Sequence, residues 1–148
     1  QPNATEFMEH LIASLSGGSG DRNRDGRLTL AEWCDAGAAA TLQWYEREDF
    51  VVTENALLDD NGDGLGTRLP LNAAEGGLDG VEAGRVVIME EPALRAAPPE
   101  AVTKYREAIQ AVEAWKAQKT GVEERAYWAR LEELLLEAAR LNPALPAK

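Results

Sequence analysis

Oxygen-bearing residues recur at regular positions in the segment DRNRDGRLTLAE, residues 21–32. Carboxylate, amide, hydroxyl and carbonyl oxygens are the hard ligands that a calcium ion takes, about six to eight of them in a flexible shell. If the segment is numbered from 1 to 12, such groups stand at positions 1, 3, 5, 7, 9 and 12. These groups are Asp21, Asn23, Asp25, the carbonyl of Arg27, Thr29 (direct or through water) and Glu32. The segment therefore predicts a calcium site.

Two further residues fit the same loop. Gly26 stands at position 6, where the backbone must turn sharply, and Leu28 stands at position 8, where an apolar side chain usually points inward. Glu32 can bind with both oxygens because the following helix is expected to begin near position 9. This is the spacing of an EF-hand-type loop. A surface loop of Asx-turns that binds no ion would explain the Asp, Asn and Gly residues, but not Leu28 and Glu32.

Charge and context predict that this site is weak. SGGSG precedes the loop where an ordinary EF-hand has a helix, and Arg22, Arg24 and Arg27 offset its three carboxylates. Because like charges repel the ion, though screened by solvent, we expect a dissociation constant of about 0.1–1 mM, as in extracellular modules. The affinity favours a structural ion and a secreted or periplasmic location over a cytosolic sensor.

A second segment, DDNGDGLGTRLP at 59–70, repeats the first half of the pattern. Asp59, Asn61 and Asp63 stand at positions 1, 3 and 5, and Leu65 stands at position 7. The match then fails, since position 8 is glycine, position 12 is proline and no amphipathic helix follows. An ion here would need its last carboxylate from elsewhere. The candidates within reach are Glu75, Asp79 and Glu82. A rigid Asx-turn without an ion is the alternative.

The net charge of −11 is unevenly distributed along the 148 residues. Residues 1–91 carry 18 acidic and 6 basic side chains, whereas residues 92–148 carry 8 and 9. A surface that binds phosphates needs clustered Lys and Arg, so nucleic acid is not an expected partner. No apolar run approaches the roughly 18 residues needed to span a bilayer.

Hydrophobic periodicity predicts the elements that carry these loops. Apolar residues recur at helical spacing in 3–15, and again from within the first loop to about Arg47. Two more such segments follow the prolines of 91–100. The β-branched run at 85–89 predicts a short strand. The expected fold is mainly α with long ordered loops and a short strand, in which residues 1–91 form a calcium-binding helix-loop region and 92–148 a helical hairpin. The facing residues of that hairpin are expected to be Val102, Tyr105, Ile109, Val112 and Trp115 against Tyr127, Leu131, Leu134, Ala138 and Leu141.

His10 and Cys34 are the only residues of their kinds and could suggest a thiol-protease dyad. Neither lies in a motif that would activate a thiolate, so an exposed histidine and a small buried cysteine are the simpler interpretation. We assign no catalytic residue in this chain.

The order of four segments resembles one group of bacterial secreted proteins with a legumain- or caspase-like (clan CD) α/β domain. The segments are NATEFMEHLIASL, DRNRDGRLTLAEWCDAG, YEREDFVVTENALLDDNGDGLGT and YWARLEELLLEAARL. In that group a calcium-type loop and a DDNGDG segment follow the protease-like core, and a helical hairpin closes the chain. The resemblance covers most of the sequence.

The resemblance implies that this chain is the C-terminal portion of a larger protein, whose His-Gly motif and Cys-bearing strand lie upstream of Gln1. Nothing in the chain matches either motif, so no catalytic role carries over to it. Two functions remain as hypotheses. The first is a structural, non-catalytic calcium-binding module. The second is the C-terminal part of a caspase- or legumain-like cysteine peptidase, with the upstream protease-like domain as its partner.

Overall fold

The computed structural model describes residues 5–16, 20–71 and 79–145. Helices account for 58% of the chain, so the mainly α class predicted from the sequence is confirmed. In the described residues the strands form two small sheets of two antiparallel strands each, one joining β1 to β4 and the other joining β2 to β3. The chain divides into two compact units, residues 1–22 with 27–89 and residues 23–26 with 90–148.

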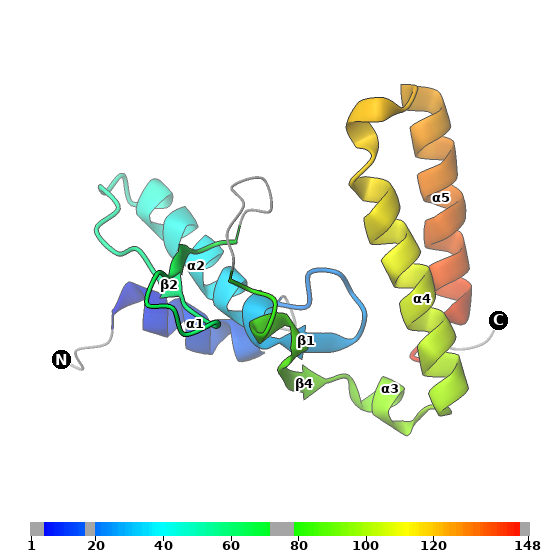
Figure 1. The fold of residues 1–148 in the computed structure, drawn as a ribbon, viewed down its shortest axis with the longest axis horizontal. Helices are drawn as coiled ribbons and strands as arrows, with labels where there is room; N and C mark the ends of the chain where they lie inside the picture. The colour runs from blue at the N-terminus through cyan, green and yellow to red at the C-terminus, as the bar shows by residue number, and fades with distance from the viewer. Residues whose placement is uncertain (1–4, 17–19, 72–78, 146–148) are drawn as a thin grey trace. The chain divides into compact units, whose positions relative to one another are not determined.

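The first unit is built around two helices, α1 (Glu6–Ser16) and α2 (Leu30–Arg47) (Figure 1). The N-terminal amides of α1 are satisfied from a distance, since Glu6 and Phe7 donate to the carboxylate of Glu54 at 3.2 and 3.0 Å. Thr5 accepts a third bond, from the amide of Met8. Carboxylates at this end also interact favourably with the helix dipole. Glu54 therefore fixes where α1 begins.

The two helices approach closely at Gly37. A Cβ atom there would lie 2.8 Å from Cδ1 and 3.0 Å from Cα of Leu11, so only glycine fits. The indole Nε1 of Trp33 donates to the carbonyl of Leu11 at 2.8 Å. The absence of a side chain at Gly37 therefore lets Leu11 of α1 lie close to α2.

The strands of the first unit are short. β1 (Arg27–Thr29) pairs with β4 (Val87–Glu90), and β2 (Leu57–Leu58) pairs with β3 (Thr67–Arg68) in the register Leu57 to Arg68 and Leu58 to Thr67. A 3-10 turn, η2 (Ala83–Arg85), leads into β4. Residues 50–56, between α2 and β2, have no regular secondary structure.

The second unit contains the short helix α3 (Pro92–Ala96) and two long helices, α4 (Pro99–Lys116) and α5 (Glu124–Leu141), with the 3-10 turn η3 (Lys119–Gly121) between them. Figure 1 shows α4 and α5 side by side and running in opposite directions. Their core contains Leu94, Val102, Tyr105, Ile109, Val112, Leu134 and Ala138. In the described part of the chain, no helix has both the length and the apolar character needed to cross a bilayer.

Candidate metal centre

The C-terminal part of the first loop meets the start of α2 in the first unit. Thr29 is the N-cap of α2, and its hydroxyl accepts the amide proton of Glu32 at 3.3 Å. In return Oε2 of Glu32 accepts from the amide and the hydroxyl of Thr29, at 3.1 and 2.8 Å. This capping box satisfies two orphan donors at once. It also places the residues at positions 9 and 12 side by side.

Residues 23–26 of the first loop belong to the second unit, where they form a tight turn. The amide of Asp25 donates to Oδ1 of Asn23 at 2.8 Å, which closes an Asx-turn. Arg24 and Gly26 have φ angles of +60° and +80°, both in the left-handed region. That region suits glycine and is costly for other residues. The backbone at position 6 thus turns as a calcium loop requires.

The residues of the first loop differ in how far they are buried. All six predicted ligand residues, Asp21, Asn23, Asp25, Arg27, Thr29 and Glu32, are half-buried. Arg22 and Arg24 are exposed, so water screens their charge. Leu28, at position 8, is 7% exposed and lies against Gly20. Leu28 is therefore buried, as an inward-pointing residue at position 8 should be.

The oxygen-bearing residues suit a hard cation, but the carboxylate of Glu32 already accepts hydrogen bonds in the capping box of α2. Among the described residues, no group of three His, Cys, Asp or Glu side chains is arranged to hold a metal ion. In an EF-hand, amide and carbonyl oxygens supply part of the shell in addition to such side chains. If Glu32 bound an ion with both oxygens, Oε2 would be shared with the amide and hydroxyl of Thr29.

The second loop folds on its own carboxylates. Asp59 accepts from the amides of Gly62 and Gly64 at 2.8 and 2.9 Å, and Asn61 accepts from the amide of Asp63 at 2.8 Å. Oδ1 of Asp63 in turn accepts from the amide of Leu65 at 2.7 Å. This network is a series of Asx-turns, in which the side chains of the loop accept its own backbone amides.

The structure separates the three candidates for the last ligand of the second loop. Glu75 lies outside the described residues. Glu82 forms an exposed ion pair with Arg85. Asp79 is buried against the loop, where its carboxylate accepts from the amide of Asp60 at 3.2 Å and from the amide and hydroxyl of Thr67 at 3.0 and 2.6 Å. Asp79 therefore braces the loop through both oxygens.

Hydrogen bonding also sets the acidity of Asp79. The hydroxyl of Thr67 is the main cause of a pKa below the ordinary value for aspartate, and the amides of Asp60 and Thr67 act in the same direction. Partial desolvation opposes them. Asp60, which the sequence pattern did not single out, accepts from the amides of Gly80 and Ala83 at 2.9 and 2.8 Å. Its position directly after Asp59 is the only sequence signal that could have indicated this role.

Cys34 does not have the environment of a nucleophile. Burial, and secondarily the charge of Asp35, raises the pKa of its thiol above the ordinary value. A reactive cysteine needs the opposite shift, because the thiolate is the attacking species. Nε2 of His10 lies 4.0 Å from the carboxylate of Glu6, its neighbour on α1. The structure thus gives the pair no feature of a catalytic dyad.

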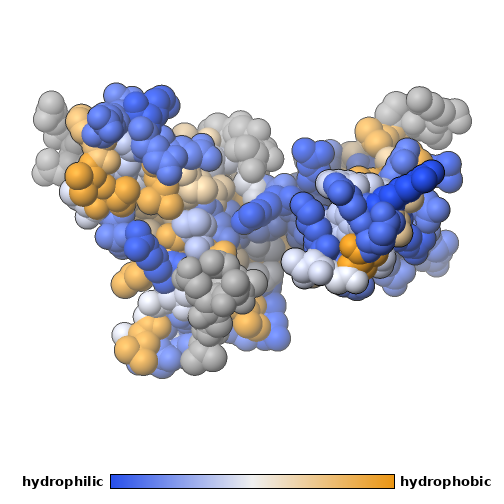
Figure 2. Space-filling model, turned by 90° about the horizontal axis from the view of Figure 1, so that it is seen from above, coloured by the Kyte–Doolittle hydropathy of each residue, from blue (hydrophilic) through white to orange (hydrophobic). Residues whose placement is uncertain are grey.

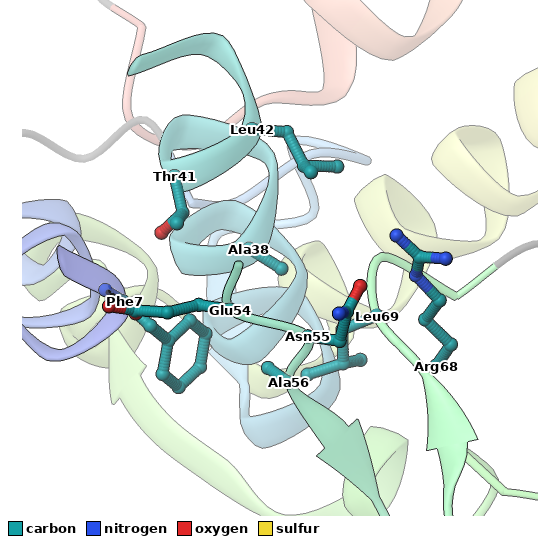
Figure 3. A pocket seen from close by; sticks show the side chains of 9 residues that line it. All are labelled: Phe7, Ala38, Thr41, Leu42, Glu54, Asn55, Ala56, Arg68 and Leu69. Atoms are coloured by element: carbon teal, nitrogen blue, oxygen red, sulfur yellow. Dashed lines mark hydrogen bonds between the residues drawn. The ribbon is translucent and has the colours of Figure 1, made fainter. Parts of the chain in front are cut away.

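A small cavity lies where α1, α2 and the segment before β2 meet (Figure 3). Its lining includes Phe7, Ala38, Thr41 and Glu54, and its volume is about 10 Å³. That is about the space of one water molecule. The cavity belongs to the packing around the Glu54 cap and is too small for an organic substrate.

Comparison of the chain with models of protein families, with curated proteins and with solved structures found no match.

Proposed function

We propose that this chain is a structural calcium-binding module in which residues 21–32 hold one ion. The ligands are Asp21, Asn23, Asp25, the carbonyl of Arg27, Thr29 and Glu32. The observation that carries the proposal is the left-handed turn at Gly26, φ +80°, inside a complete set of oxygen-bearing residues at EF-hand spacing. The half-burial of all six ligand residues supports it.

The second loop is proposed as a weaker site, formed by Asp59, Asn61, Asp63 and Leu65. The side chains of Asp59, Asn61 and Asp63 already accept hydrogen bonds from backbone amides, so an ion would bind to a turn that is already formed. Between β3 and β4, the described residues contain no α-helix that could supply a residue equivalent to Glu32. We therefore expect the first loop to dominate the calcium titration.

Calorimetry on variants of the two loops distinguishes calcium binding at one from binding at the other. Wild-type protein should bind calcium with a dissociation constant of about 0.1–1 mM, and Glu32→Ala should weaken the stronger site at least about tenfold. Glu46→Ala is the matched control, since Glu46 is an exposed carboxylate on the same helix. Asp63→Ala should leave the stronger site unchanged. If Glu32→Ala and Glu46→Ala bind calcium as the wild type does, the first loop is not the site.

The alternative function is that of a C-terminal part of a caspase- or legumain-like peptidase, whose catalytic residues lie upstream. One feature of the surface favours this alternative. Val86, Val87, Ile88 and Met89 are all exposed, and Figure 2 shows apolar side chains at the surface among charged ones. Exposed apolar strands commonly mark interfaces. A longer polypeptide that carries the upstream region should bind less of a hydrophobic dye per molecule than this chain does.

A further inference from the structure

The turn at residues 23–26 is held by the helices of the second unit. Arg24 adopts φ +60°, a conformation that is unfavourable for a residue with a side chain. Its carbonyl accepts a hydrogen bond from the hydroxyl of Tyr105, which is 81 residues away in the sequence. The hydrogen bond favours the conformation that the local chain alone would avoid.

Gly26 is fixed from the other side. A Cβ atom at this position would overlap Cδ1 of Leu94, which is 2% exposed. The carbonyl of Gly26 accepts from the amide of Glu91 at 2.8 Å. The backbone at positions 4 and 6 of the first loop is thus set by contacts within the second unit.

The hydroxyl of Tyr105 has little freedom to move. The side chain is 4% exposed and belongs to the core that α4 and α5 share with Leu94. Nδ2 of Asn142, at the end of α5, also donates to this hydroxyl at 3.5 Å. The packing of the two long helices therefore determines where the hydroxyl meets the loop.

We propose that Tyr105 is a positioning residue for the calcium loop, and that calcium affinity at residues 21–32 depends on the packing of α4 and α5. The inference rests on the proposed function. It differs from the expectation drawn from the sequence, in which residues 92–148 are a helical hairpin separate from the calcium-binding region. Since coupling is reciprocal, calcium binding must in turn stabilise the contacts around residues 23–26.

Tyr105→Phe tests the proposal, because it removes the hydroxyl and keeps the ring in the core. A single hydrogen bond of ordinary strength corresponds to a change of about threefold to tenfold in affinity. We expect calorimetry to show that loss at the stronger calcium site. Tyr127→Phe is the matched control, since Tyr127 is the other buried tyrosine of this unit and stacks on Trp115. Unchanged affinity in Tyr105→Phe, or an equal loss in both variants, overturns the proposal.

A second measurement uses the unaltered protein. Calcium should slow hydrogen exchange at the amide of Glu91, which donates to Gly26, and at the amides of α4 around Tyr105. Glu32→Ala should abolish that protection. If calcium binds and Glu32→Ala removes the binding, but exchange at Glu91 and α4 does not change, the positioning role is wrong and the calcium site stands. If Glu32→Ala does not affect binding, the proposed function itself fails.

Discussion

Asp60 and Asp79 brace each other through their backbones. The amide of Asp60 donates to the carboxylate of Asp79, and the carboxylate of Asp60 accepts from the amide of Gly80, the residue after Asp79. Each aspartate thus fixes the chain beside the other, across 19 residues. Both carboxylates therefore accept backbone amides and join the second loop to the segment that follows it.

The brace predicts that stability depends on pH in a definite direction. The pKa of Asp79 is lower in the folded protein than the ordinary value of 3.8. A carboxylate of this kind stabilises the fold above its unfolded pKa, and that contribution is lost as pH falls through the folded value. Asp79→Asn should therefore lower the free energy of unfolding at pH 7. The difference from the wild type should shrink below about pH 4.

Urea unfolding at a series of pH values measures this effect. Glu82→Gln is the control, because Glu82 is an exposed carboxylate of the same segment, paired with Arg85. Its substitution should change stability by less than about 0.5 kcal/mol at any pH. A deficit in Asp79→Asn that stays constant down to pH 2 would mean that packing, and not charge, explains the role of Asp79.

Gly37 gives a prediction in which packing opposes helix propensity. Alanine in place of glycine normally stabilises a helix by up to about 1 kcal/mol. At Gly37 the added carbon would meet Leu11, including its backbone Cα at 3.0 Å, so α1 and α2 would have to separate. We expect Gly37→Ala to lower the free energy of unfolding by about 1–3 kcal/mol. Chemical denaturation monitored by circular dichroism gives this quantity.

Gly84→Ala is the control for that measurement. No atom would lie within 4 Å of the added carbon, and the φ angle of Gly84 is not in the left-handed region. This variant should be within about 0.5 kcal/mol of the wild type, or slightly more stable. A neutral Gly37→Ala would show that the two helices are not packed as closely as described.

The sequence predicted the helices well because their apolar spacing is local information. On α2 the helical spacing of Leu30, Trp33, Ala40 and Trp44, with Gly37 in the slot between them, predicts one packed face. Gly37 is buried and the other four residues are half-buried. The residues that are buried in α2 are Gly37, Ala38, Thr41 and Tyr45. Periodicity gives most weight to large side chains, whereas α1 approaches α2 where the side chains are small. The face of α2 therefore depends on its neighbour, which periodicity does not report.

The candidate site also combines features that are local in the sequence with contacts between distant residues. The proposed ligand positions and Gly26 follow a local pattern, so they could be proposed from twelve consecutive residues. The hydroxyl of Tyr105 on Arg24 and the carboxylate of Asp79 on Thr67 join residues 81 and 12 positions apart. Tyr105 was predicted as a core residue, which is correct for its ring. Nothing in its sequence context indicates where the hydroxyl points.

Calcium should raise the thermal stability of the protein if the first loop binds it. Binding to the folded state alone adds about 2.7 kcal/mol at a hundredfold excess over the dissociation constant. For a chain of this size that corresponds to about 5–10 °C in Tm. Differential scanning calorimetry with calcium, and again with a chelator, measures the shift. Glu32→Ala should lose most of it, whereas Glu46→Ala should keep it.

The same titration distinguishes a structural ion from a sensor. A structural ion should leave the helix content nearly unchanged, because Thr29 and Glu32 already cap α2 in the structure. Far-ultraviolet circular dichroism and binding of a hydrophobic dye should therefore vary little with calcium. A large increase in dye binding on calcium addition would contradict the structural role, since it would indicate that the ion opens an apolar surface.

Two adjacent leucines of α5 test how the second unit is packed. Leu134 is 6% exposed and belongs to the core with Ile109 and Val112, whereas Leu135 is 49% exposed. Truncation of a buried leucine typically costs about 2–5 kcal/mol, through lost transfer free energy and the cavity that remains. We expect Leu134→Ala to lower the free energy of unfolding by that amount. Leu135→Ala should cost about 0.5 kcal/mol or less.

The pair is well matched, because both substitutions remove the same atoms from the same helix and change helix propensity equally. Urea unfolding followed by far-ultraviolet circular dichroism would report the loss of these helices. If the ion loop depends on the packing of α4 and α5, Leu134→Ala should also weaken calcium binding, while Leu135→Ala should not. Equal losses of stability in the two variants would mean that Leu135 is covered in solution, and the face of α5 that carries it would then be an interface.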